Sequence, residues 1–370
     1  MIPLYRARLG IYLYIKEIIK DNKNEVLLSP FTIFDVVNMV ISAGGKPIFV
    51  DIKSQNDTNI CLEDLKKNIN KNTCCILLTH YHFNNQDLSK IIKLCSENDV
   101  KLIEDCAISL GSVEIGKHVG YFSDAAIFSF SIFKFISVYQ GGGLYIKDKK
   151  IRDKIIKEIS LYKKFKIIEM FNYFSKSLKF SILTSKYFFP IIFYFIRIGY
   201  KNDIKIIRDN IKNDPKPFLR KSISESFLKK VNLFQLKEFS RQLDNLYYYQ
   251  EIRKNNFLNY NNKLKIYSKI SNPHQSFLNF PIVFKNYDSK RLFMNYIMKR
   301  GFDVGEYYYR SCNSEKVFKN FKKDCPNSEH FSKCVVTLPT HYKIEKNYIN
   351  QICIYISDFL EIFPKSIICD

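Results

Sequence analysis

The sequence predicts an α/β fold: a mostly parallel central sheet flanked by helices, followed by a smaller C-terminal α+β domain. Three observations lead to this prediction. Strand-like and helix-like stretches alternate through residues 1–150. The strand-like stretch 73–80, TCCILLTH, is almost wholly apolar, as strands covered on both faces usually are. Beyond residue 270, further strand-like and helix-like stretches are mixed, which is typical of a separate, smaller unit.

Each element follows from local patterning. Glycine pairs end helix-like stretches, and apolar residues at helical spacing mark 87–98. In the first part of the chain we expect strands over 25–29, 47–52, 73–80, 101–105, 124–130 and 142–148, and helices over 35–45, 61–70 and 87–98. In the last part we expect strands over 277–284 and 333–339, and helices over 288–300 and 346–362.

The polar, proline-containing stretch KNDPKP divides the chain in this interpretation. We expect a cofactor-binding large domain over residues 1–215, and a helix-rich connection with a small C-terminal domain over 216–370. The large domain carries a hydrophobic helical insertion at about 151–210. The apolar run 187–196 in this insertion is too short for a membrane-spanning helix, which needs about 20 residues. Packing against the body or at a dimer contact is the favoured interpretation. Contact of residues 160–200 with an anionic membrane surface is the alternative.

Composition restricts the class of protein. Apolar residues make up 46% and charged residues 25% of the chain, which is typical of a soluble globular protein. Arginines and lysines interrupt the first 20 residues, so we expect no secretory signal and a cytoplasmic protein, with membrane association at the inner face as an option. The net charge of +22 comes from lysines spread along the chain, so we expect no specific nucleic-acid partner. The ten cysteines are scattered, which favours buried, reduced thiols and no metal site.

The candidate chemistry lies where predicted strands end. Asp105 ends one strand, Ser129 lies near the end of another, and Lys134 follows in an apolar loop before Gly141–Gly143. The carboxyl ends of parallel strands are where such sheets bind ligands. An acid and a lysine at adjacent strand ends are therefore expected to reach one ligand.

These residues also carry a resemblance to a known family. The order VDI, THYHFNNQDL, LIEDCAISLGS, FSDAAIFSFSIFK and GGGLYI resembles the sugar aminotransferases of the DegT/DnrJ/EryC1/StrS type. The resemblance extends back through SPFTIFDVVNMVISAGG and forward through SISESFLKKVNLFQL, MKRGFDVGEYYY and VVTLPTH. It leaves out 151–210. It implies a homodimeric, pyridoxal-phosphate-dependent enzyme of aspartate-aminotransferase fold type I.

The resemblance gives roles to the motif residues. Lys134 matches the family lysine that binds the cofactor covalently and then moves protons, which suits a lysine whose pKa is lowered in a partly dry site. Asp105 matches the acid under the pyridine nitrogen, which keeps that nitrogen protonated. Ser129 matches a serine that contacts the phosphate.

Several family positions differ here. Ile108 stands where the family usually has a glutamine beside the cofactor's phenolic oxygen. The glycine–serine turn that cradles the phosphate is replaced by RARLGIYLY, in which Arg6 or Arg8 would supply positive charge instead. The residue that covers the cofactor ring is either Ile33 or Phe34. We expect the following residues to line the substrate pocket: His80, Tyr307 and Tyr308.

His80 and His82 in HYH also suggest metal binding, but no third ligand at suitable spacing is evident, so a structural or pocket-lining role is preferred for His80. The predicted function is transfer of an amino group, with glutamate as the expected donor, to a nucleotide-linked keto sugar for surface polysaccharide synthesis. The altered positions leave an alternative open: a weakened or inactive relative that binds a ligand or a membrane.

Overall fold

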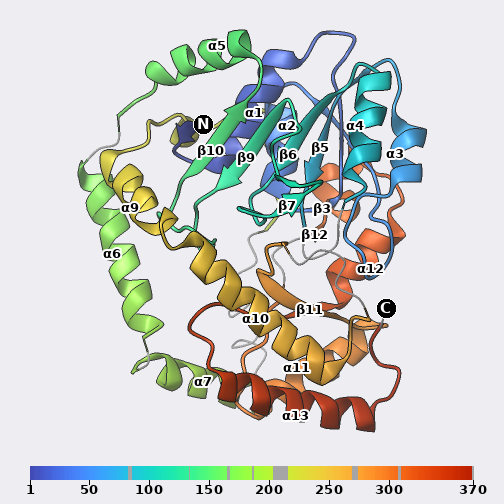
Figure 1. The fold of residues 1–370 in the computed structure, drawn as a ribbon, viewed down its shortest axis with the longest axis vertical. Helices are drawn as coiled ribbons and strands as arrows, with labels where there is room; N and C mark the ends of the chain where they lie inside the picture. Colours follow the sequence, from blue (N-terminus) through green and yellow to red (C-terminus); the bar gives the residue numbers. More distant parts are fainter. Residues whose placement is uncertain are drawn as a thin grey trace.

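The computed structural model describes residues 1–81, 86–132, 134–164, 167–185, 187–202, 216–268, 274–306 and 310–368. Its centre is a seven-stranded sheet in the order β1-β10-β9-β6-β5-β2-β4 (Figure 1). The five strands from β9 to β4 are parallel, whereas β10 runs antiparallel to both of its neighbours. The strands are β1 (Ile2–Leu4), β2 (Glu25–Leu28), β4 (Lys46–Phe49), β5 (Thr73–Thr79), β6 (Lys101–Asp105), β9 (Ala125–Ser129) and β10 (Gly142–Ile146). The expected mostly parallel central sheet is confirmed.

Helices cover both faces of this sheet because its strands are apolar on both sides. Successive side chains of a strand point to opposite faces. Leu77 accordingly packs in the core under α1 and α2, and Ile76 packs in the core under α3 and α4. The helices of this part of the chain are α1 (Ala7–Ile18), α2 (Phe34–Ser42), α3 (Leu62–Asn68), α4 (Leu88–Glu97) and α5 (Lys149–Ser160). Helix α1 was not among the elements expected from the sequence.

The second part of the chain forms the smaller α+β unit below the sheet in Figure 1, around a two-stranded antiparallel pair. Its apolar core contains Phe280, Phe293 and Phe359 and also takes in Phe31 and Ile108 from the first part of the chain. Its elements are α9 (Leu233–Leu243), α10 (Leu246–Leu264), β11 (Asn279–Val283), α11 (Tyr287–Lys299), α12 (Pro326–Cys334), β13 (Val335–Pro339) and α13 (Lys346–Ile362). The expected smaller α+β unit is confirmed, whereas the boundary at 215/216 stays a prediction.

Short elements and two outlying helices complete the described chain. The 3-10 helices are Glu225–Phe227, Cys312–Ser314 and Lys316–Phe321. The short strand pairs are β3 (Phe31–Thr32) with β12 (Arg310–Ser311), and β7 (Val113–Glu114) with β8 (Lys117–His118). The outlying helices are α6 (Ile167–Leu183) and α7 (Phe189–Lys201), which occupy the expected insertion and run along the outer edge of the molecule in Figure 1. Among the described residues, no helix combines the length and apolar character that crossing a membrane requires.

A buried ion cluster fixes the carboxyl ends of β5 and β6. The His80 Nε2 atom lies 2.7 Å from Glu104 Oε2, and His80 Nδ1 lies 3.6 Å from Glu114 Oε1. Glu104 also accepts a hydrogen bond from the Gly120 amide at 2.9 Å, and Glu114 accepts one from Gln275 Nε2 at 3.0 Å. Burial disfavours the charged imidazole, but the hydrogen bond to Glu104 and the nearby Glu114 carboxylate outweigh it and raise the pKa of His80 to about 9. The protonated ring therefore neutralises carboxylates that are nearly inaccessible to water.

This cluster predicts a pH-dependent stability. Because the pKa of His80 rises from an ordinary 6.5 to about 9 on folding, its contribution is complete below pH 6.5 and is lost as the pH rises through 9. We expect His80→Asn to lower the free energy of unfolding by about 3–5 kcal/mol near neutral pH, because it leaves Glu104 and Glu114 without a counter-charge. Thermal unfolding measured from pH 6 to pH 10 tests this. The exposed His118 provides the control, His118→Asn, which should follow the parent protein. Parallel pH profiles for His80→Asn and His118→Asn would contradict the charge assigned to His80.

Candidate active site

Asp105 is the last residue of β6 and lies at the carboxyl edge of the parallel strands, paired in register with Thr79 of β5 and Ile127 of β9. Its side chain is 5% exposed, and its Oδ1 atom accepts a hydrogen bond from the Ala107 amide at 3.0 Å. Burial raises the pKa of Asp105, although the Ala107 amide and the charges of Lys134 and His80 act in the opposite direction. A buried carboxyl group in this state is best stabilised by a cationic partner.

Consecutive acids on β6 serve opposite faces of the sheet. The Glu104 side chain points to the same face of the sheet as that of Leu102, which packs under α3 and α4. On that face Glu104 pairs with His80. The Asp105 side chain points to the same face as that of Ile103, which packs under α1 and α2. Asp105 therefore faces the side of the sheet that carries α1.

Lys134 lies in the loop after β9, and its backbone amide donates to the Ser131 carbonyl at 3.2 Å. The side chain is half-buried. Loss of water around the amine lowers the pKa of Lys134 to about 8; the Arg8 charge also lowers it, whereas the Asp105 carboxylate opposes the shift. The mutual influence of Lys134 and Asp105 means that the loop brings the lysine to the end of β6. The lowered pKa favours the neutral, nucleophilic form of the amine more than in an ordinary exposed lysine.

Helix α9 holds this loop in place. Gln242 accepts from the Ser137 amide at 2.8 Å and donates to the Ser137 carbonyl at 2.8 Å. Gln235 donates to the Gln140 carbonyl. The Phe130 and Phe239 rings meet with their centroids 4.6 Å apart. These contacts hold the loop at Phe130, before Lys134, and at Ser137 and Gln140, after it.

An arginine cluster lies at the N-terminus of α1. Arg6 is the N-cap residue of α1, and its Nε atom donates to Gln140 Oε1 at 3.1 Å. Arg8 pairs with Asp35 in the first turn of α2, and Arg220 Nη2 lies 3.9 Å from the other Asp35 oxygen. The guanidinium groups of Arg6 and Arg220 lie 4.6 and 4.7 Å from the centre of the Phe227 ring.

This cluster holds more positive than negative charge. Burial, together with the charges of Arg6 and Arg220, lowers the pKa of Arg8 to about 10. The Arg220 Nη1 atom is buried and has no hydrogen-bond partner among the described residues. A helix N-terminus and clustered guanidinium groups together favour a phosphate or another anion. Arg8 is also the charge that lowers the pKa of Lys134, which places the cluster within electrostatic reach of the lysine.

The other sequence-predicted residues fall into three groups. Ser129 ends β9, and its hydroxyl lies 3.2 Å from that of Ser131, on the face of the sheet where Asp105 points. Ile33 is the N-cap residue of α2 and keeps part of its surface exposed. Phe34 is buried, and the centroids of the Phe34 and Phe218 rings are 5.3 Å apart. Ile108 is 2% exposed within the apolar core of the smaller unit.

Some predictions cannot be followed in the structure. Tyr307 and Tyr308 lie outside the described residues, as does His82. His80 is described, and both its ring nitrogens face glutamates rather than an open pocket.

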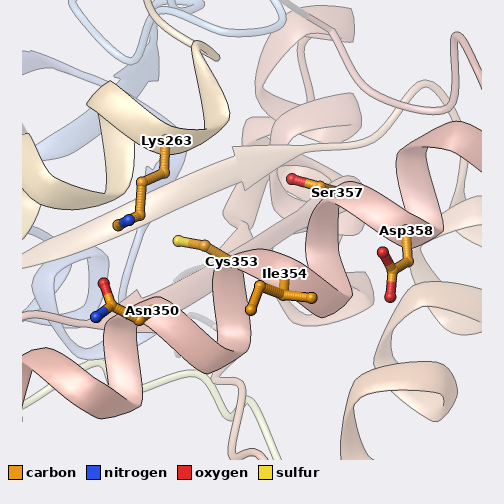
Figure 2. Close-up of a pocket in the computed structure, with 6 residues that line it drawn as sticks. All are labelled: Lys263, Asn350, Cys353, Ile354, Ser357 and Asp358. Atoms are coloured by element: carbon orange, nitrogen blue, oxygen red, sulfur yellow. The ribbon is translucent and has the colours of Figure 1, made fainter.

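Two hollows lie away from this centre. Figure 2 shows one of about 240 Å³ between α10 and α13, lined by Lys263, Asn350, Cys353, Ile354, Ser357 and Asp358. A second, of about 180 Å³, lies behind Gly141 and Gly142, against Phe239 of α9. Neither is lined by Asp105 or Lys134. The candidate site is defined here by the charged groups around Asp105 and Lys134.

A possible metal set lies next to Asp105. Donor atoms of His80, Glu104 and Cys106 all lie within 4.8 Å of one another. Burial raises the pKa of the Cys106 thiol well above its ordinary value, and the raised pKa of His80 keeps its ring protonated. Metal ligands must be deprotonated, so this arrangement is better described as an ion pair beside a thiol.

Sequence reasoning missed several of these residues. Glu114, Arg220, Gln235 and Gln242 are distant in the chain from the motif around Lys134, and no local pattern marks them. Asp105, Ser129 and Lys134 could be found from the sequence because they lie in the stretch 101–143, which carries the resemblance to the family. The partners of that motif come from α9, from β7 and from the segment before Phe227.

Comparison with known proteins agrees with this geometry. Solved structures that share the fold include PseC of Helicobacter pylori (TM-score 0.72, 20% identity, 98% of this chain and 86% of that one). Another is the pyridoxal-phosphate form of the putative sugar aminotransferase Spr1654 from Streptococcus pneumoniae (TM-score 0.69, 16% identity, 98% and 87% of the two chains). At these identities the likeness concerns the fold.

Curated relatives match over shorter stretches. GDP-perosamine synthase of Vibrio cholerae is 34% identical over 134 residues, which are 36% of this chain and 36% of the relative. UDP-4-amino-4,6-dideoxy-N-acetyl-beta-L-altrosamine transaminase of Helicobacter pylori is 32% identical over 149 residues, which are 40% and 39% of the two chains. The matched stretches thus span less than half the length of these relatives.

The family model extends over much more of the chain. It matches residues 9–170 and 230–357, which include most of α1, the ends of β6 and β9, the Lys134 loop and most of the smaller unit. The resemblance predicted from the motif is confirmed: the chain belongs to the DegT/DnrJ/EryC1/StrS aminotransferase family.

Proposed function

We propose that this protein is a pyridoxal-phosphate-dependent aminotransferase that moves an amino group from an amino acid, glutamate in our expectation, to the keto carbon of a nucleotide-linked sugar. The observation that carries the proposal is the proximity of Asp105, at the end of β6, to Lys134, in the loop after β9, where the charge of each group shifts the pKa of the other. Relatives named as nucleotide-sugar aminotransferases support the substrate class.

The residues present fit the cofactor. Asp105 is a buried acid that lacks a hydrogen-bonded cationic partner among the described residues, as a carboxylate facing a pyridinium nitrogen requires. The arginine cluster and the Ser129–Ser131 hydroxyl pair offer the cations and donors that a phosphate group prefers. Of the two candidates for covering the ring, Ile33 keeps free surface while Phe34 is packed against Phe218, so Ile33 is the better choice.

When bound, pyridoxal phosphate supplies an electron sink for the substrate carbon that loses its proton. Lys134, whose amine has a pKa lowered to about 8, would hold the cofactor covalently and would carry the proton at the substrate carbon once released. The Asp105 carboxylate would hold the cofactor's pyridine nitrogen and would favour its protonated form. The Glu104–His80 pair holds the end of β6 from the opposite face, so the Asp105 backbone is fixed while its side chain meets the ligand.

Further parts of the proposal come from the family. We infer that the protein works as a homodimer in the cytoplasm, that Tyr307 and Tyr308 contribute to the substrate pocket, and that the product enters surface polysaccharide synthesis. A spore coat polysaccharide biosynthesis protein of Bacillus subtilis is among the relatives. His80 contributes indirectly, through the charge it places beside Asp105.

The competing function is a relative that binds the cofactor or sugar without turnover. The observation that favours it is Ile108, an apolar residue packed into the core where a hydrogen-bonding side chain is usual in the family. The two functions differ in whether glutamate reacts with the bound cofactor.

Covalent attachment of the cofactor is the first test. Purified protein mixed with pyridoxal phosphate should develop a visible absorbance band, which glutamate bleaches. Lys134→Ala should lack the band and should gain no cofactor mass after borohydride reduction, because no amine is available at that position. The exposed Lys147 provides the control, Lys147→Ala, which should behave as the parent does. Equal labelling of parent and Lys134→Ala would refute the role of Lys134. A band that glutamate leaves unchanged would favour the non-catalytic alternative.

Phosphate binding by the arginine cluster is the second test. We expect Arg8→Met to weaken binding of pyridoxal phosphate by about tenfold or more, in line with one lost charge-assisted hydrogen bond. Binding of pyridoxal, which has no phosphate, should change little. Equilibrium dialysis of both compounds gives the ratio of the two affinities. Arg152→Met, an arginine on α5 distant from the cluster, serves as the control. An unchanged ratio in Arg8→Met would contradict the assignment.

A further inference from the structure

Helices α6 and α7 expose an unusual amount of apolar side chain. The family model leaves out residues 171–229, so most of α6 and all of α7 lie outside the stretches that match the family. Phe171 is 66% exposed, Phe174 63%, and Phe195 60%. The remaining large apolar side chains exposed on this segment are Ile168, Leu178, Ile182, Leu183, Tyr187, Phe188, Phe189, Ile191 and Tyr194. We call these twelve residues the α6–α7 surface.

This surface is held in position by the rest of the chain. Phe193 and Ile196 of α7 pack against the core of the smaller unit. Arg197 Nε donates to the Lys299 carbonyl, the last residue of α11, at 2.9 Å. Near the other end, Glu169 of α6 pairs with Lys229. The α6–α7 surface thus faces outward from a fixed support, along the edge of the molecule in Figure 1.

The charges around the α6–α7 surface are almost all positive. Between residues 170 and 202 the sequence contains lysines and one arginine but no aspartate or glutamate. Lys176 and Lys179 are exposed among the apolar residues of α6, and Lys163 and Lys164 precede the helix. The one acid on α6, Glu169, is already paired. A basic helix pair with exposed aromatic residues has the composition of a segment that lies in a membrane interface.

We propose that the α6–α7 surface docks on an anionic phospholipid membrane, with the aromatic rings at the headgroup level and the lysines against lipid phosphates. A second copy of the chain is a poorer occupant, because it would set lysines of one α6 against those of the other on molecules that each carry a net charge of +22. The described helices lack the length and apolar character to cross a bilayer, which agrees with a segment lying along its surface. This inference is independent of the proposed reaction, since no residue of the site takes part in it.

Vesicle sedimentation of the full-length protein tests the proposal. We expect binding to vesicles with about one third phosphatidylglycerol, little binding to pure phosphatidylcholine, and loss of binding between about 0.05 and 0.5 M salt. Lys176→Glu/Lys179→Glu should lower binding by tenfold or more. The control Lys67→Glu/Lys71→Glu makes the same change in net charge at exposed lysines at and after the end of α3, and it should lower binding much less.

An apolar pair of variants completes the test. Phe174→Ser/Leu178→Ser should also reduce binding strongly, whereas Ile354→Ser/Ile362→Ser at exposed positions of α13 should not. Equal binding to neutral vesicles, equal effects of the two lysine pairs, or no binding at all would overturn the proposal. Sedimentation velocity without lipid gives a further check. If Phe174→Ser/Leu178→Ser converts an oligomer to a smaller species, a second copy of the chain covers the α6–α7 surface, and the proposal is overturned. Each variant keeps its core residues, and thermal unfolding checks that it is folded.

Discussion

The pair between His80 and Glu104 ties the end of β5 to the end of β6, and the arrangement of the candidate site depends on it. Two adjacent carboxylates end β6, and both are buried. The two side chains point to opposite faces of the sheet. On one face, His80 and the Gly120 amide bind Glu104. On the other face, Asp105 can bind a ligand. Without a protonated His80, the strand end would carry two uncompensated buried charges, and ionisation of Asp105 would become more costly.

The position of Lys134 depends on a second, neutral set of contacts. Gln235 and Gln242 of α9 hold the backbone of the loop on the far side of the lysine, and Arg6 of α1 holds Gln140. These hydrogen bonds connect the sheet to the helices that lead into the smaller unit. A shift of α9 relative to the sheet would therefore move Lys134 away from Asp105. The electrostatic interaction between Lys134 and Asp105 therefore depends on the position of α9.

The sequence was most informative where one local pattern determines the structure. The apolar run 73–80 was predicted as a buried strand, and the strand at 101–105 with Asp105 at its end has the predicted bounds. Helix α1 was missed because Arg6, Arg8 and Lys16 break its apolar pattern, and those charges are satisfied by distant partners such as Asp35 and Glu158. Glu114 and Arg220 could not be predicted, because their roles come from contacts between segments that are far apart in the chain.

If pyridoxal phosphate binds as proposed, the apolar Ile108 and the arginine cluster bear on the same physical problem, which is how the cofactor is retained. Ile108 gains burial in an apolar core and can give no hydrogen bond to a cofactor ring. The cofactor ring would therefore lose one hydrogen bond. Arg6, Arg8 and Arg220, in contrast, add positive charge at the N-terminus of α1, where the cofactor phosphate would lie. Charge-assisted hydrogen bonds to phosphate are about twice as strong as neutral ones. Retention of the cofactor would thus shift from its ring to its phosphate, and the reactivity of Lys134, whose pKa Arg8 lowers, would change together with that retention.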